Sequence, residues 1–142
     1  MEVLSFAGVP TMLFLQPPTP EMLKHHPNLQ AIGVARLARS KDPSWMRAEL
    51  PKIFAALKRF KAPVTHYKVC STFDSSSEVG SIGTAAEIGA DVFGSDWMPL
   101  IVGAPAIRRY QAFGNFIAGA GAENHRLDRH PVMSRHPVTP MQ

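Results

Sequence analysis

The densest group of polar side chains in the sequence follows a short apolar run. Hydroxyl groups can donate hydrogen bonds to a carboxylate or accept them from a polyol, and a lysine beside them can supply a counter-charge. A helix that starts after such a segment presents free N–H groups and a positive dipole end, which favour anions. Serines here also serve simply as helix caps, so the composition leaves both roles open. The residues are Lys68, Ser71, Thr72, Asp74, Ser75, Ser76 and Ser77.

Two further polar segments also follow apolar runs. Arg39 and Ser40 come after one of them, and a guanidinium there could bind a carboxylate through two parallel hydrogen bonds. A solvated arginine beside a helix cap is the alternative, and it is the commoner case for such a pair taken alone. The other segment is residues 103–109. All three segments are candidate positions for a ligand.

Apolar runs alternate with helical patterns along most of the sequence. This alternation predicts an α/β fold with three layers, α/β/α, and a mostly parallel sheet. Ligands bind beyond the carboxyl ends of the strands in such a sheet, which is where the three polar segments lie. The core is predicted to span residues 9–103, and residues 104–142 an irregular tail rich in Gly, Arg, His and Pro. The predicted strands are 11–15, 31–35, 63–69 and 97–102.

Capping residues locate the predicted helices. One helix ends at Gly8, and Thr19 caps a short second helix. Asp42 caps a long third helix, which Pro51 would kink or split. A fourth helix is predicted over residues 78–93.

The remaining reactive side chains form no recognisable catalytic pattern. His125, His130 and His136 are five and six residues apart, which does not match a helical ligand pair, so no metal site is predicted. The one cysteine, Cys70, is predicted to be a small buried residue, because no histidine stands out as its base. Neither a Walker A sequence nor a paired-glycine nucleotide loop occurs.

Composition and charge exclude several classes of protein. With 45% hydrophobic and 18% charged residues, the chain is unlike a disordered one. The net charge of +4 comes without a nucleic-acid-binding motif, so no nucleic-acid partner is expected. No apolar run approaches the ~18 residues that cross a bilayer, so no membrane association is expected. The first residues lack the pattern of a secretory signal and the chain has a single cysteine, so a cytoplasmic location is expected.

Both ends of the sequence are predicted to lie within a longer domain. Residues 1–8 are typical of the last turns of a helix, whereas an α/β domain usually begins with a strand. Residues 137–142 contain two prolines and no terminating element. The α/β domain is therefore predicted to be incomplete at its N-terminus. A natural small protein with irregular ends is the alternative.

Four stretches together resemble the four-carbon acid sugar kinase family over nearly the whole chain. The central one, residues 66–83, contains Cys-Ser-Thr-Phe-Asp-Ser-Ser; the others are residues 39–40, 102–106 and 135–141. The resemblance implies an N-terminal domain that binds the sugar acid in an ATP-dependent kinase. Such kinases phosphorylate the terminal hydroxyl of threonate, erythronate or 3-oxo-tetronate. The resemblance implies ATP and Mg²⁺ as cofactors of the full-length protein, and none is expected for this chain alone.

The resemblance also implies which residues contact the sugar acid. Asp74 stands where many members have arginine, so it would either bind a substrate hydroxyl or only cap the helix. The implied substrate-binding residues are Arg39, Ser40, Lys68, Ser71, Thr72 and Asp74, and the additional candidates are Ser75, Gly103 and His136.

The sequence also departs from the family pattern. The acidic loop with which the family opens, Ala-Asp-Asp followed by an apolar residue, Thr and Gly, does not occur, so the catalytic residues are unknown. The ATP-binding domain is missing too. We therefore expect this chain alone to be inactive and open to self-association through unpaired strand edges, unless another chain supplies the missing kinase segments. A degenerate or split-gene α/β module that acts through protein contacts is the alternative.

Overall fold

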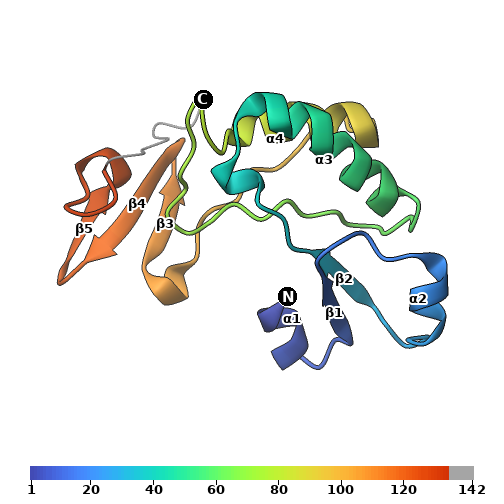
Figure 1. Cartoon of the computed structure of the whole chain (residues 1–142). Coiled ribbons are helices and arrows are strands. Elements are labelled where there is room, and N and C mark those ends of the chain that lie inside the picture. Colours follow the sequence, from blue (N-terminus) through green and yellow to red (C-terminus); the bar gives the residue numbers. More distant parts are fainter. Residues whose placement is uncertain (135–142) are drawn as a thin grey trace.

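The computed structural model describes residues 1–134 of the chain, and Figure 1 shows its elements. Helices and strands form two separate sheets, a parallel pair and an antiparallel group of three. The helices are α1 (Glu2–Phe6), α2 (Pro20–Lys24), α3 (Pro43–Lys58) and α4 (Ile82–Phe93), with 3-10 turns η1 (Ala38–Ser40), η2 (Pro105–Ile107) and η3 (Leu127–Arg129). The strands are β1 (Thr11–Phe14), β2 (Ala31–Val34), β3 (Arg109–Ala112), β4 (Asn115–Ala120) and β5 (Glu123–Arg126).

The first sheet is the parallel pair that the sequence predicts. Strands β1 and β2 align from Thr11 opposite Ala31 to Phe14 opposite Val34. The connecting helix α2 is capped by Thr19, whose hydroxyl oxygen accepts from the backbone N–H of Met22 at 3.3 Å. The prediction of an α/β fold is confirmed at this coarse level.

A pair of packed helices forms the main core. Helix α3 begins where predicted, because the Asp42 carboxylate accepts from the backbone N–H of Trp45 at 2.7 Å, and it continues unbroken through Pro51. Helix α4 begins at Ile82, four residues later than predicted, with Ser81 as its cap. Each large side chain that the pair buries contributes about 1.5–3 kcal/mol. These core residues are Ala38, Met46, Leu50, Ile53, Phe54, Ala85 and Ile88.

Two predicted strands are wrong. Residues 63–69 and 97–102 form no β-ladder within residues 1–134, because a strand needs a neighbouring strand and neither segment has one. The side-chain amide of Gln111 instead serves as a substitute partner for the second segment, accepting from the N–H of Val102 and donating to the carbonyl of Leu100, both at 2.9 Å. The three-layer arrangement stays a prediction.

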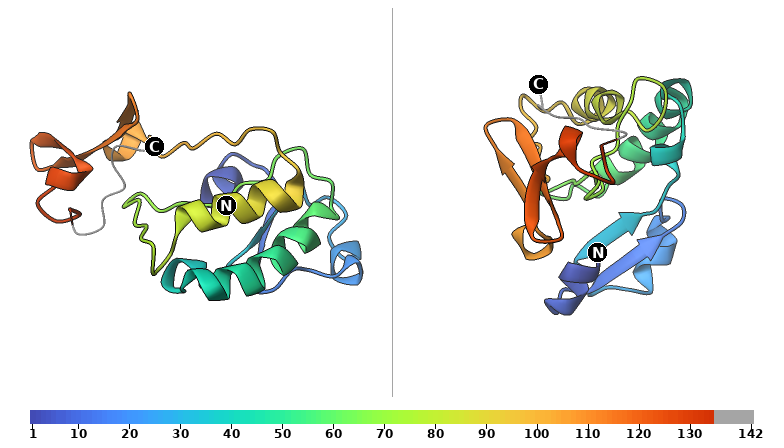
Figure 2. Two further views of the ribbon diagram at one scale, coloured as in Figure 1. Left: turned by 90° about the horizontal axis from the view of Figure 1, so that it is seen from above. Right: turned by 90° about the vertical axis from the view of Figure 1, so that its left-hand side faces the viewer.

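Residues 109–126, which we expected to be irregular, form the antiparallel sheet β3-β4-β5 instead, so the structure is not mostly parallel. The β3–β4 turn places Phe113 and Gly114 at positive φ, as a two-residue hairpin requires. One face of β4 is buried, and its Phe116 ring meets Phe73 edge to face at 5.7 Å. The left view of Figure 2 separates this sheet from the helix pair. A second core therefore forms beneath the sheet, comprising Phe73, Val102, Phe116, Ala118 and Leu127.

We expect the buried contact of Gly80 to make it sensitive to substitution. A Cβ added to Gly80 would lie 2.4 Å from the carbonyl oxygen of Arg39, so Gly80→Ala must displace backbone. Gly94→Ala is the matched control, because Gly94 has a similar positive φ but nothing within 4 Å of the added Cβ. In urea unfolding, we expect losses of about 2 kcal/mol or more for Gly80→Ala and about 1 kcal/mol for Gly94→Ala. Equal losses would contradict the packing described here.

Candidate functional site

Two of the polar segments meet, as the sequence predicts. The guanidinium Nη2 of Arg39, at η1, donates to the hydroxyl of Thr72 at 3.1 Å and also forms an ion pair with Asp74. These partners are 33 and 35 residues away in the sequence. We call Arg39, Cys70, Thr72 and Asp74 the loop cluster. It brings a cation, a hydroxyl, a carboxylate and a thiol together.

The backbone holds the two segments against each other. The N–H of Gly80 donates to the carbonyl of Lys41 at 2.8 Å, and the close contact of Gly80 with Arg39 leaves no room for a side chain. Phe73, fully buried, anchors the middle of the loop in the core beneath the antiparallel sheet. The loop is therefore fixed from two sides, although it contains no strand or helix of its own.

Hydrogen bonds link Arg39, Thr72 and Asp74 in a triangle. The Thr72 hydroxyl donates to Asp74 Oδ2 at 2.7 Å. The hydrogen bond with Asp74 is the largest cause of the raised pKa of Arg39. Both bonds from Arg39 to oxygen atoms use Nη2, so Nε and Nη1 donate to no oxygen within residues 1–134. Because the side chain is 58% exposed, these nitrogens can reach a ligand from solvent.

The half-buried thiol of Cys70 lies next to these groups. Burial raises its pKa, but hydrogen bonds from the hydroxyl and backbone of Thr72, with the positive charges of Arg39 and Lys68, outweigh burial and lower the pKa to about 7. Thr72 has one hydroxyl hydrogen, so Asp74 and Cys70 compete for it. The expectation that Cys70 is merely a small buried residue therefore misses its electrostatic contact with the loop cluster.

Two of the predicted site residues are engaged in local structure. The hydroxyl of Ser40 donates to the carbonyl of Leu37 at 3.0 Å and closes the η1 turn. Ser75 accepts from the backbone N–H of Ile82 at 2.9 Å, at the start of α4. The Ser75 hydroxyl therefore fits the capping alternative that the sequence left open.

The other predicted residues differ in how close they lie to the loop cluster. Lys68 is exposed and forms no ion pair in the described part of the chain, although its charge acts on Cys70. The backbone carbonyl of Ser71 faces Arg109 of β3, whose Nε donates to it at 3.3 Å. Gly103 packs beside Gln111 instead. His136 lies outside the described residues.

Arg109 is the site neighbour that sequence reasoning missed. It lies in the third polar segment, residues 103–109, which was a candidate because it follows a predicted strand. Nothing in its sequence context shows that it contacts Ser71. That contact depends on the antiparallel sheet, which was not predicted. A signal for this sheet was present in the sequence. The glycine-containing turn Phe113-Gly114 lies between segments in which apolar and polar residues alternate, a pattern typical of a hairpin.

The histidines of this region have structural contacts. Nδ1 of buried His130 accepts from the backbone N–H groups of Val132 and Met133, at 3.1 and 3.0 Å. His125 contacts the His130 ring edge to face at 6.0 Å. In residues 1–134, no three His, Cys, Asp or Glu side chains are placed to hold a metal ion. The helices in the same range are also too short or too polar to cross a membrane.

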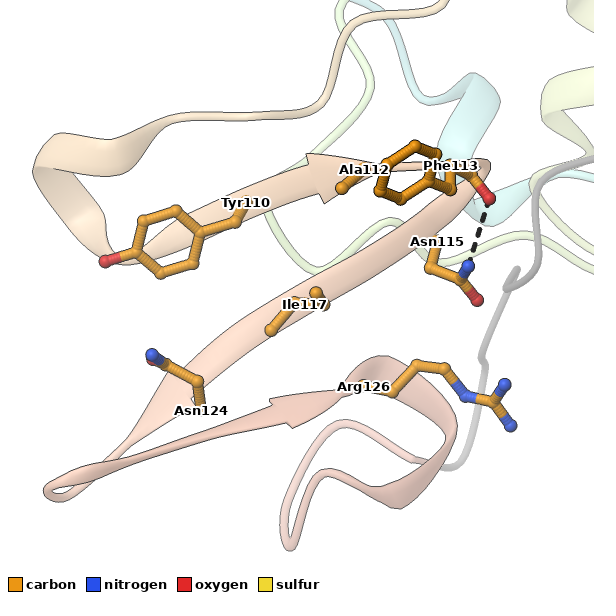
Figure 3. A pocket seen from close by; sticks show the side chains of 7 residues that line it. All are labelled: Tyr110, Ala112, Phe113, Asn115, Ile117, Asn124 and Arg126. Atoms are coloured by element: carbon orange, nitrogen blue, oxygen red, sulfur yellow. Dashed lines mark hydrogen bonds between the residues drawn. The ribbon is translucent and has the colours of Figure 1, made fainter.

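Two hollows have linings that include no residue of the loop cluster. The larger, of about 660 Å³, opens on the outer face of the antiparallel sheet, where Figure 3 shows Tyr110, Ile117 and Asn124 along its walls. Its one charged lining group, Arg126, is already paired with Asp128, with Nε to Oδ1 at 2.7 Å. A smaller hollow of about 320 Å³ lies beyond β1 and β2, lined by Leu15, Ala35, Arg36, Leu37 and Trp45.

The loop cluster suits a polar anion better than either hollow. Arg126 of the larger hollow and Arg39 of the loop cluster are each paired with a carboxylate, but the Arg39 side chain is the more exposed, at 58% against 40%. The smaller hollow is lined by Arg36 and four apolar residues, with no hydroxyl or carboxylate among them. The loop cluster offers an exposed arginine, a hydroxyl and a carboxylate. Such a set can bind a carboxylate and a hydroxyl of the same small molecule.

The pKa of Cys70 gives a direct test of these electrostatics. Only the thiolate reacts with iodoacetamide, so alkylation should reach half its maximal rate near pH 7 and slow as the thiol protonates at lower pH. Cys70 is the one cysteine of the chain, so the measured rate reports this site alone. A midpoint close to 9, the ordinary value, would mean that Thr72, Arg39 and Lys68 do not act on the sulfur as described.

Comparison with known proteins identifies the family of the chain. Residues 1–142 match a family described as a sugar-binding N-terminal domain. The chain is 52% identical over 141 residues to a 3-oxo-isoapionate kinase of Paraburkholderia graminis, covering 99% of this chain and 30% of that protein. The chain thus spans about a third of the length of this curated relative. No solved structure matches. The chain belongs to the family of sugar-binding N-terminal domains.

Proposed function

We propose that this chain is the sugar-acid-binding part of an ATP-dependent kinase that phosphorylates a terminal hydroxyl of its substrate, and that the loop cluster is the binding site. The observation that carries the proposal is the contact of Arg39 with Thr72 and Asp74, which places an exposed guanidinium beside a hydroxyl and a carboxylate. Membership of a sugar-binding family and similarity to a kinase support it.

In this proposal each group binds a different part of the ligand. Nε and Nη1 of Arg39 form a fork for the substrate carboxylate, because Nη2 is already engaged by Thr72 and Asp74. Lys68, exposed beside the loop, adds a second positive charge. Asp74 and Thr72 hydrogen-bond substrate hydroxyls. Ser71, half-buried in the same loop, is the remaining polar contact.

We propose a small sugar acid as the substrate, either of four carbons, such as threonate, erythronate or 3-oxo-tetronate, or of the type that the relative's name gives, 3-oxo-isoapionate. The four-carbon acids follow from the sequence motifs. The second follows from 52% identity over almost the whole chain, including the segment with the loop cluster.

The residues present do not fit the metal and nucleotide of a kinase. Asp74 is held by Arg39 and Thr72, and residues 1–134 contain no group of three side chains suited to a metal ion. We therefore derive no phosphoryl-transfer step from this chain. We propose that ATP and Mg²⁺ bind to further kinase segments, such as the 70% of the relative that the chain does not cover.

Replacing Arg39 tests the proposed site. Calorimetric titration of the chain with each of the four sugar acids, without ATP, should show binding of at least one of them. Arg39→Ala should weaken this binding at least about tenfold, since a hydrogen bond to a charged group contributes about 1.5–3 kcal/mol. Arg47→Ala is the matched control, because Arg47 is equally exposed, at 58%, and also pairs with one carboxylate, that of Glu87.

The control variant should bind as tightly as the original chain. Equal weakening in the two variants would mean that general positive charge, and not the loop cluster, attracts the acid. No heat of binding with any of the four acids would remove the support for a competent site in this chain.

A further inference from the structure

Arg109 ties the loop cluster to the antiparallel sheet. Its Nε donates to the carbonyl of Ser71 at 3.3 Å, and its Nη1 donates to the carbonyls of Ile107 and Arg108, each at 3.2 Å. Nη2 lies 3.8 Å from the sulfur of Met133. The side chain is half-buried, and no carboxylate forms an ion pair with it within residues 1–134. Nε therefore contacts the loop, while the other nitrogens contact residues near Arg109 itself and Met133.

The peptide unit between Ser71 and Thr72 lies at the centre of this contact. The carbonyl oxygen and the N–H of a trans peptide point in opposite directions from one rigid plane. Arg109 holds the carbonyl side, and the N–H on the other side belongs to Thr72, whose backbone helps to lower the pKa of Cys70. An arginine that fixes the carbonyl therefore also fixes the direction of the N–H and the position of the Thr72 Cα, from which its side chain leaves the backbone.

The loop needs such support. Phe73 has a positive φ of 52°, which is costly for a bulky residue, and the hydrogen bond from its N–H to the carbonyl of Cys70 closes only a single turn. The guanidinium of Arg109 supplies a charged donor to this peptide, through the hydrogen bond to the carbonyl of Ser71. Arg108 differs, because its guanidinium binds the carbonyls of Gly121 and Glu123 and does not reach the loop.

We propose that Arg109 is a positioning residue of the candidate site, which holds the Ser71–Thr72 peptide so that Thr72 faces Arg39 and Asp74 in the arrangement that binds the ligand. What the site binds rests on the proposed function, whereas the positioning itself does not. The antiparallel sheet then has a role in the site, because it carries the arginine that orients the loop.

Three variants separate positioning from charge and from general stability. Arg109→Met removes charge and donors, while Arg109→Lys keeps the charge but loses the planar group that reaches several carbonyls. Arg108→Met is the matched control, since it removes a neighbouring arginine that braces the same sheet without touching the loop. Each variant is measured for its melting temperature, for the pH profile of Cys70 alkylation by iodoacetamide, and for sugar-acid binding.

We expect the alkylation midpoint to rise by about half a pH unit in Arg109→Met, the size of one weakened hydrogen bond, and to rise by a smaller amount in Arg109→Lys. Sugar-acid binding should weaken several-fold in both. Arg108→Met should lower the melting temperature and leave the midpoint where it is in the original chain.

Three results would overturn the proposal. An unchanged midpoint in Arg109→Met shows that the arginine does not orient the peptide. A midpoint in Arg109→Lys equal to that of the original chain shows that charge alone acts, and this variant decides the question if Arg109→Met does not unfold cooperatively. An equal shift in Arg108→Met shows a general effect of the sheet. A shifted midpoint in a chain that binds no sugar acid supports the positioning and contradicts the proposed function.

Discussion

The candidate site depends on the burial of one aromatic ring. Phe73 is fully buried beneath the antiparallel sheet, although its backbone adopts a positive φ. Strain of this kind costs about 1–3 kcal/mol, and burying a phenylalanine side chain stabilises the fold by about 1.5–3 kcal/mol, so the ring can offset the strain. Because Thr72 and Asp74 flank Phe73, the anchored ring sets where their side chains emerge from the loop.

The polar groups act as a unit around this anchor. Arg39 approaches from the other polar segment, and its ion pair with Asp74 is exposed enough to add little stability by itself. The ion pair orients the guanidinium, because it engages Nη2 and leaves Nε and Nη1 without an oxygen partner in residues 1–134. Thr72 connects Asp74 with Cys70, because its hydroxyl donates a hydrogen bond to Asp74 and its proximity lowers the pKa of Cys70.

Local features could be predicted from the sequence, and pairing between distant segments could not. Asp42 specifies the start of α3 through one side-chain hydrogen bond, so a short motif was enough. Residues 63–69 have a strand-like sequence, but whether they pair depends on a neighbouring strand. The sheet of β3 to β5 was missed because glycines such as Gly114 were interpreted as breaks when they form turns. The meeting of the polar segments was predicted, whereas Arg109 was not, since its acceptors are backbone carbonyls that no sequence pattern displays.

We propose that the loop cluster, and not the open face of the antiparallel sheet, receives the sugar acid. Assigned ¹⁵N–¹H spectra of the chain recorded during titration with a sugar acid test it most directly. We predict concentration-dependent shifts of the backbone amides of Arg39, Thr72 and Asp74, and much smaller shifts for Tyr110, Ile117 and Asn124 in the larger hollow. Shifts confined to the sheet residues, with the loop amides unmoved, would place the ligand on the sheet and not at the loop cluster.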